Sequence, residues 1–294
     1  MNNLILGASG KIGSYLIKND KSVLYTYNSK KIKGGIRFNF LKNNISKIIK
    51  KKKINAVVLM AAISDPNICY KKRNLTNKIN VLSTIKILKE LIKKNIYFIF
   101  FSSEFVFSGK KKNFSEKDKT RPINVYGKQK LTVEKFIIKN AKKYSILRIA
   151  KTYGDDLNDD TLISSYLKNL LLGQKKFTVA SDQFFSPLFI GDLKKIIKIF
   201  MKKKINGLFN VGGPERLSRY DCLNNVNKFL NEKHQYKIKL KKIKLENFSF
   251  YDKRPLDVSM NIQKLNKVIN FKMTKINKVA KKMIKKNMLN EKLS

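Results

Sequence analysis

Residues 3–13, which read NLILGASGKIG, decide the fold of this chain. The run at 3–6 is mostly apolar, as in a short strand, and it leads into evenly spaced glycines at Gly7, Gly10 and Gly13. A helical pattern of apolar residues follows. Glycines at this spacing let the backbone turn sharply and approach a pyrophosphate, which then lies on the helix N-terminus. The stretch predicts a dinucleotide site, and an ordinary turn between a strand and a helix is the alternative.

The glycine loop and the second strand-like run together indicate the cofactor. Residues 28–31, which follow the run at 23–27, contain no Asp or Glu, although NAD sites usually place an acid there for the ribose hydroxyls. Amide, hydroxyl and ammonium groups suit a 2′-phosphate, so we expect NADPH and leave NADH open. The contacts predicted from these two stretches are Gly7, Ser9, Gly10, Lys11, Ile12, Gly13, Asn28 and Ser29.

Strand-like and helix-like segments alternate outward from this loop. The runs at 56–62 and 96–101 are apolar throughout, as parallel strands buried on both faces are. Such alternation predicts an α/β fold, a Rossmann-type doubly wound parallel sheet. The remaining strand-like runs are 23–27 and 145–149, and the helix-like segments are 78–94 and 126–142.

The regular pattern ends near Gly154, where a polar loop with four aspartates begins at 155–160. We expect residues 1–154 to form an NADP(H)-binding domain. Residues 155–294 are expected to form mainly a smaller, discontinuous C-terminal substrate lobe, with a segment at about 188–213 returning to the first domain. The stretches without a clear period, which we expect to be irregular, are 174–190 and 236–262.

Length and composition exclude several classes of protein. The chain has 294 residues, of which 43% are hydrophobic, so it is neither too small for a core nor a disordered polycation. Its two cysteines exclude a disulfide scaffold and have no metal-ligand spacing, so no metal is expected. No apolar run reaches the ~20 residues of a membrane helix, and the start of the chain does not resemble a signal peptide. We therefore expect a cytoplasmic protein, with the single histidine, His234, at its surface.

The net charge is +45, from 65 basic and 20 acidic residues. Such a charge is typical of proteins that bind nucleic acids or anionic membranes. The lysines, however, occur in nearly every amphipathic stretch, for example at 194–198 and 281–286, and the abundance of Lys, Asn, Ile, Phe and Tyr is that of an AT-rich genome. We favour compositional bias and expect no dedicated nucleic-acid or membrane partner. Binding to nucleic acid remains an alternative.

A tyrosine with a lysine one helical turn later can protonate a ketone as it is reduced. The ammonium favours the phenolate and so lowers a pKa that starts near ~10. Three tyrosines have a basic residue at this spacing, so the spacing alone decides nothing. Only Tyr126 lies at a helix start shortly after a buried strand, and that strand ends in serines at the sheet edge where ligands bind. The three pairs are Tyr27/Lys31, Tyr126/Lys130 and Tyr144/Arg148.

Five segments beyond the glycine loop share one family pattern. The segment PINVYGKQKLTVE at 122–134 is similar to PLNVYGxxKxxGE, and FSSEFVFSG at 101–109 is similar to STDYVFDG. With these segments the chain resembles the dTDP-4-dehydrorhamnose reductase family of the extended short-chain dehydrogenases/reductases over most of its length. The other matching segments are AAISDP at 61–66, SDQFFSPLFIGDL at 181–193 and RPLDVSMNIQKL at 254–265.

The resemblance implies roles for particular side chains. It makes Tyr126 the catalytic acid, Lys130 its partner and Ser103, at the family's threonine, the group that bonds the substrate carbonyl. Arg254 becomes a candidate for the substrate diphosphate, with a structural salt bridge as the alternative. The cofactor residues implied are Ala61, Ala62, Ile63, Tyr126, Lys130 and Asn80, which matches an asparagine that supports the lysine. The substrate residues implied are Ser103, Glu104, Phe105 and Arg254.

The implied function is an NADPH-dependent reductase of a nucleotide-linked 4-keto-6-deoxyhexose, an oxidoreductase of dTDP-rhamnose biosynthesis. A nucleotide-sugar epimerase is an alternative, as is a non-catalytic NADP-binding subunit similar to the regulatory subunit of methionine adenosyltransferase. A dehydratase is disfavoured because Glu104 is followed by Phe105, where dehydratases carry adjacent Asp and Glu. The expected partner is a nucleotide-sugar substrate, and a homodimer is left open.

Overall fold

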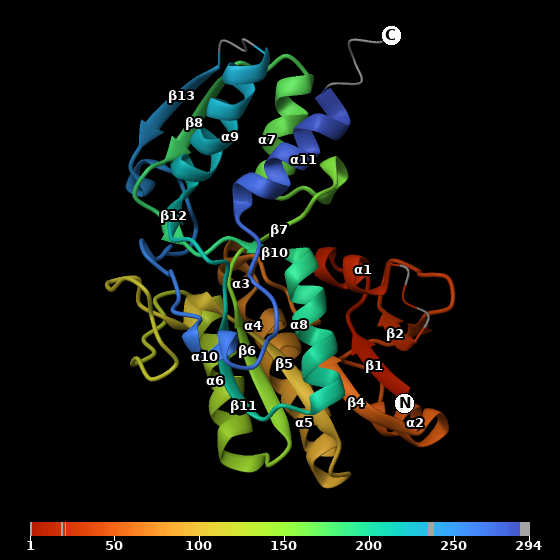
Figure 1. Ribbon diagram of the computed structural model, residues 1–294. Helices are drawn as coiled ribbons and strands as arrows, with labels where there is room; N and C mark the ends of the chain where they lie inside the picture. The colour runs from red at the N-terminus through yellow and green to blue at the C-terminus, as the bar shows by residue number, and fades with distance from the viewer. Residues whose placement is uncertain (1, 19, 21, 235–237, 289–294) are drawn as a thin grey trace.

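The computed structural model describes residues 2–18, 20, 22–234 and 238–288. A seven-stranded sheet has the order β11-β6-β5-β4-β1-β2-β3, and every neighbouring pair in it is parallel. Helices cover both faces (Figure 1), which confirms the predicted doubly wound α/β fold. The strands are β1 (Asn2–Leu6), β2 (Val23–Tyr27), β3 (Ile36–Arg37), β4 (Ile54–Leu59), β5 (Tyr97–Ser103), β6 (Tyr144–Ile149) and β11 (Gly207–Val211).

The central strands are buried on both faces because their alternate side chains enter two different cores. In β4, Ala56 and Val58 belong to one core, and Val57 and Leu59 belong to the other. The first core includes residues of α1 (Lys11–Ile17) and α8 (Ile190–Lys203). The second includes residues of α2 (Ile45–Lys52), α5 (Thr84–Lys93) and α6 (Val125–Asn140). This double burial explains why the strand runs in the sequence are apolar throughout.

The helix predicted at 78–94 forms, and its first part is π-helical. A π-helical turn over Lys78–Ser83 precedes α5, and Asn80 is buried in this turn. Such turns recur at functional sites, because the extra residue changes which side chains face inward. The other short elements are α3 (Pro66–Lys71), α4 (Arg73–Asn77), β7 (Thr152–Tyr153), β9 (Phe184–Phe185), β10 (Leu188–Phe189), β12 (Leu217–Ser218) and α10 (Gln263–Asn266).

A smaller group of elements lies beyond the carboxyl edge of the sheet (Figure 1). Three helices share one core there, and two short strands pair in parallel beside them. The prediction of irregular structure at 174–190 and 236–262 is therefore wrong in part. Both strands are partly exposed, and a lysine-rich strand such as KLKKI has no apolar alternation to reveal it. The elements are α7 (Leu162–Leu171), α9 (Arg219–His234), α11 (Ile276–Met288), β8 (Lys176–Ala180) and β13 (Lys239–Ile243).

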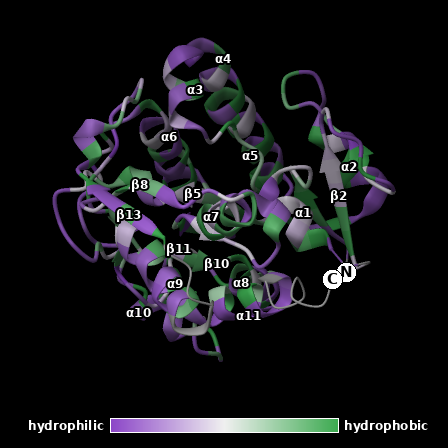
Figure 2. Cartoon of the chain, turned by 90° about the horizontal axis from the view of Figure 1, so that it is seen from above, coloured by the Kyte–Doolittle hydropathy of each residue, from purple (hydrophilic) through white to green (hydrophobic). Residues whose placement is uncertain are grey.

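Two later segments pack with the sheet. Helix α8 contributes to the first core, β11 pairs with β6, and Leu265, Ile269 and Met273 join the same core. The division of the chain at residue 154 remains our proposal. Figure 2 shows hydrophilic positions spread over many elements. No helix in the described part of the chain is long and apolar enough to cross a membrane, and the side chain of His234 lies outside the described ones.

Candidate active site

The carboxyl ends of β1, β4, β5 and β6 open into a cleft of 1260 Å³. The strand order reverses between β1 and β4, and ligands of doubly wound sheets bind at this switch point. The sheet side of the cleft carries Gly7, Ser103 and Tyr126, and the opposite side carries Gln183 and Arg219. The cleft therefore lies between the sheet and the smaller group of elements.

The glycine loop fits a dinucleotide pyrophosphate. Gly7 has φ +97°, and a Cβ there would lie 2.6 Å from Ala61 Cβ. A Cβ on Gly13 would lie 2.5 Å from Ala8 Cα, so both glycines are required for the loop to pack. Gly10 differs, because its Cβ would meet nothing nearer than the Gly7 carbonyl oxygen at 3.7 Å. Its backbone, which lines the cleft at the start of α1, therefore stays open to a ligand.

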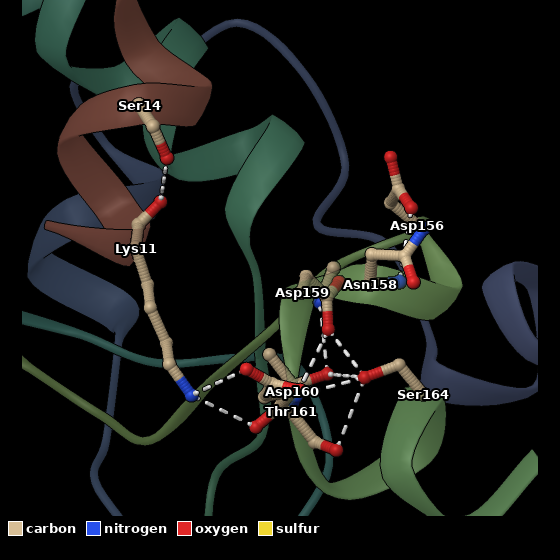
Figure 3. Close-up of polar contacts among 9 residues, drawn as sticks. Lys11, Ser14, Asp156, Asn158, Asp159, Asp160, Thr161 and Ser164 are labelled. Carbon is tan, nitrogen blue, oxygen red and sulfur yellow. Dashed lines mark hydrogen bonds and ion pairs between the residues drawn. The ribbon is translucent and has the colours of Figure 1, made fainter. Parts of the chain in front are cut away.

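The side chain of Lys11 extends from the start of α1 to Asp160 in the acidic loop at 155–160 (Figure 3). Its Nζ donates to the Asp160 carbonyl oxygen at 3.1 Å and lies 3.8 Å from Asp160 Oδ2. Tyr15 in α1 also donates to Asp155 at 3.4 Å. The acidic loop at 155–160 is thus held against α1, and Lys11 is placed at the cleft mouth.

Some of the other predicted cofactor residues line the cleft and some do not. Ala62 lines the cleft, and Ala61 packs against Gly7 behind it. Asn28 and Ser29 are exposed and do not line the cleft, whereas Lys30 in the same segment does. An ammonium at this position suits a 2′-phosphate.

The three predicted catalytic residues meet at the floor of the cleft. Ser103 ends β5, Tyr126 lies in the first turn of α6, and Lys130 follows one turn later; all three are buried. The start of α6 is fixed by its cap, since Asn124 Oδ1 accepts a hydrogen bond from Gly127 N at 2.8 Å. A Cβ on Gly127 would lie 2.1 Å from the Phe105 oxygen, so only glycine allows this approach. The local packing thereby sets the position of Tyr126.

Burial controls the protonation of this group. It raises the pKa of Tyr126 above its usual value, while a hydrogen bond with Ser103 lowers it. Burial also lowers the pKa of Lys130 to about 8. The Lys130 ammonium donates to the Phe101 carbonyl oxygen at 2.7 Å and lies 5.7 Å from the Tyr126 ring centroid. A protonated Lys130 at this distance favours the phenolate and so assists proton release from Tyr126.

Asn80 is part of the wall behind the site. Its Oδ1 accepts from Ile63 N, its Nδ2 donates to Ile63 O, and both distances are 2.9 Å. Nδ2 also donates to Gln129 Oε1 at 2.8 Å. Asn80 therefore holds the segment after β4 and the neighbour of Lys130 on α6. Its described hydrogen bonds do not reach Lys130 itself.

The predicted substrate residues surround Tyr126 and the outer cleft. Phe105 meets the Tyr126 ring edge to face at 6.3 Å. Glu104 is 5% exposed, its Oε1 accepts from Lys151 N at 3.2 Å, and burial raises its pKa to about 8. Arg254 donates to Asn67 at 2.9 Å. The alternative of a structural salt bridge is not supported, since Arg254 is in none of the ion pairs of the described residues.

Among the cleft residues that the sequence analysis did not name are Lys151, Gln183 and Arg219. Arg219 Nε donates to Gln183 Oε1 at 2.6 Å. Lys151 lies two residues beyond β6, where ligand contacts are common, but the abundance of lysine hides that signal. Arg219 had no local signal, because it reaches the cleft through the packing of α9.

Comparison with known proteins identifies the family. The pattern of the RmlD substrate binding domain matches residues 1–289. The chain belongs to this family. A solved dTDP-4-dehydrorhamnose reductase of Bacillus anthracis, in complex with NADP, superimposes on this RmlD-family chain with a TM-score of 0.83 and 19% identity. The match covers 97% of this chain and 99% of that one, and it shows the fold.

Relatives of other activities also match the RmlD-family chain. Methionine adenosyltransferase 2 subunit beta of Rattus norvegicus is 24% identical over 173 residues, which are 57% of this chain and 52% of the relative. The chain spans about half the length of the mammalian subunits it matches. UDP-glucose 4-epimerase of Lactobacillus helveticus is 28% identical over 271 residues, covering 78% of this chain and 81% of the enzyme.

Proposed function

We propose that this RmlD-family protein is an NADPH-dependent reductase of the C4 ketone of a nucleotide-linked hexose. A 4-keto-6-deoxyhexose of the dTDP-4-dehydrorhamnose type is the reference substrate. The observation that carries the proposal is the meeting of Ser103, Tyr126 and Lys130 in the same cleft as the glycine loop. Membership of the RmlD family supports it.

The chain's own residues supply binding and the proton. The glycine loop would hold the cofactor pyrophosphate against α1, and Lys30, which lines the same cleft, would pair with a 2′-phosphate. The chemistry supplied by the bound cofactor is a hydride to the carbonyl carbon. Ser103 donates a hydrogen bond to the carbonyl oxygen, and Tyr126 transfers its proton to that oxygen as the alcohol forms. Lys130 stabilises the phenolate that remains.

The test is turnover of a dTDP-4-keto-6-deoxyhexose with NADPH, followed by the loss of NADPH absorbance and by chromatography of the sugar nucleotide. We expect one alcohol formed for each NADPH consumed, and a lower KM for NADPH than for NADH. NADPH binding without oxidation, over a panel of dTDP- and UDP-linked 4-keto sugars, would contradict the proposal.

The same assay separates the alternatives. An epimerase, favoured by the 28% identical relative, inverts a centre without net consumption of the cofactor. A regulatory subunit, favoured by the methionine adenosyltransferase relatives, binds NADP(H) and turns nothing over. The expectations of a homodimer, of a cytoplasmic location and of no nucleic-acid partner stay predictions.

A further inference from the structure

Two cationic side chains line the cleft with donors that no protein group uses. In the part of the chain that the structure describes, Lys151 Nζ takes part in no hydrogen bond or ion pair, although it lines the cleft. Among the described residues Arg219 uses only Nε, on Gln183, so the two terminal nitrogens of its guanidinium have no partner there. The Lys151 residue is exposed at the cleft and Arg219 is partly exposed, and partial desolvation there lowers the pKa of each. A bound anion pairs with such donors and offsets the cost of their desolvation.

Glu104 interacts electrostatically with both cations, and among the described residues it forms an ion pair with neither. Its Oε1 is bonded to the backbone N–H of Lys151, and its buried Oε2 has no partner among the described residues. With a pKa of about 8, the carboxyl keeps its proton at neutral pH. Two cationic groups and one unsatisfied buried carboxyl oxygen therefore converge on one part of the cleft. This set of groups fits a ligand with an anionic group.

The position of the group relative to Ser103 indicates which part of the substrate it meets. Glu104 follows Ser103 directly, and Lys151 lies two residues beyond Ile149, the β6 partner of Ser103. A group bonded to Ser103 and the Lys151 residue therefore lie at the same edge of the sheet, in the same cleft. Arg254 lines the same cleft and its charge acts on both cations, but it is held on Asn67 and 5.0 Å from the Phe250 ring, where a second hollow of 440 Å³ begins. This makes Arg254 the candidate for the diphosphate and leaves Lys151 and Arg219, on the Ser103 side, as candidates for the sugar.

We propose that Lys151 and Arg219 bind a carboxylate carried by the sugar of the substrate, with Glu104 as the third contact. The proposal rests on the proposed function and narrows its substrate to nucleotide-linked hexoses with an acidic substituent. The sugar then differs from the neutral 6-deoxyhexose of the reference substrate. The two side chains are specificity-determining and leave the proton transfer to Tyr126.

The test compares UDP-glucuronic acid with UDP-glucose, which differ only in a carboxylate against a hydroxymethyl group. Binding is measured by calorimetry on the full chain saturated with NADPH, so that neither sugar is oxidised, at about 0.15 M salt to screen the general charge. We expect UDP-glucuronic acid to bind at least about tenfold more tightly, the size of one charge-assisted hydrogen bond.

The variants Lys151→Met and Arg219→Gln should each reduce that preference to less than about threefold, half of the tenfold difference on a logarithmic scale. Their affinities for UDP-glucose and for NADPH are measured alongside, and each should fall by a smaller factor than the affinity for UDP-glucuronic acid. Matched controls with the same change of charge are Lys135→Met and Arg73→Gln, which remove exposed cations outside the cleft and should keep the full preference. Circular dichroism of each variant verifies folding.

Three outcomes overturn the inference. Equal affinity of the wild type for both nucleotide sugars removes the reason for a carboxylate site. If Lys151→Met and Arg219→Gln lose the same affinity for both UDP-sugars, the two cations bind the diphosphate, which both ligands share. If the control variants also lose the preference for UDP-glucuronic acid, that preference comes from the net charge of the protein. Failure of the proposed function looks different: no 4-keto sugar nucleotide is reduced, whatever the pattern of binding.

Discussion

The sheet and the smaller group of elements beyond it are held together in different ways. The sheet has two cores and a fully buried ion pair, in which Glu134 and Arg148 are 1% and 5% exposed and 2.8 Å apart. The smaller group has one core, and its strands are partly exposed. Close by, Arg216 and Asp257 pair with 26% and 10% exposure. The proposed proton donor, Tyr126, thus comes from the sheet side with its two cores, and Arg219 comes from α9 of the smaller group with its single core.

The largest expected difference in the free energy of unfolding is between variants of these two ion pairs. Glu134→Gln leaves the Arg148 charge buried without its partner, so we expect a loss of about 3–5 kcal/mol in the free energy of unfolding. Arg216→Gln removes a partly exposed partner and should cost about 1 kcal/mol or less. Urea unfolding followed by circular dichroism measures both. Equal losses would contradict the contrast between the two regions.

Removal of the proposed proton donor should affect activity and leave the fold intact. Tyr126→Phe is expected to lower kcat by about 10²–10⁴-fold, the usual contribution of a general acid. The NADPH affinity should not change, because the ring and its contact with Phe105 remain. Tyr27→Phe is the matched control, since Tyr27 has the same spacing to a lysine but does not line the cleft. A similar loss in both variants would show that the tyrosine acts only through stability.

Alanine substitutions of two glycines in the same loop should affect different properties, one the stability and the other the binding of NADPH. Gly13→Ala forces a Cβ against Ala8, and we expect a loss of about 1–3 kcal/mol of stability from overpacking. Gly10→Ala has room for its methyl group and should change stability by less than about 0.5 kcal/mol. Its methyl group should instead weaken NADPH binding. Unfolding curves and NADPH titrations of the two variants separate packing from binding.

The buried carboxyl at the boundary of the two regions should make stability depend on pH. Burial raises the pKa of Glu104 from 4.5 to about 8, so between these values the folded chain binds more protons than the unfolded chain. The stability from this group is present below pH 4.5 and is lost as the pH rises to 8. Glu104→Gln should gain about 1 kcal/mol or more over the wild type at pH 8 relative to pH 5. An equal difference at both pH values would contradict the shift.

The smallest effect is expected at the contact across the cleft mouth. Lys11 and Asp160 are 64% and 66% exposed, so Asp160→Asn should cost less than about 1 kcal/mol. The cost should vanish at about 1 M salt, where the screening length is roughly 3 Å. Thermal unfolding at two salt concentrations measures it. A large, salt-independent loss would instead show that the acidic loop holds the cleft closed.

Much of the sheet side could be predicted from the chain, because its signals are local. Gly7, Gly13 and the apolar runs report backbone shape and burial, and these follow from neighbours in sequence. Tyr126 could be selected from three equivalent pairs only because a buried strand ending in serines lies upstream. Asn28 and Ser29 were predicted at the cleft on type alone, and the structure places Lys30 there instead. In a chain with 65 basic residues, no pattern could single out Lys30 or Lys151.

The amino-acid sequence by itself determined the doubly wound sheet, the glycine loop and the candidate catalytic group. Each depends on periodicity or on side chains at the ends of single strands. Only the tertiary structure decided which cations face the cleft and which polar atoms lack a partner there. Arg219 and Glu104 are 115 residues apart in the chain, and the docking of α9 over the carboxyl edge brings both to one cleft. Such proximity arises from packing between distant segments, which leaves no local trace in the sequence.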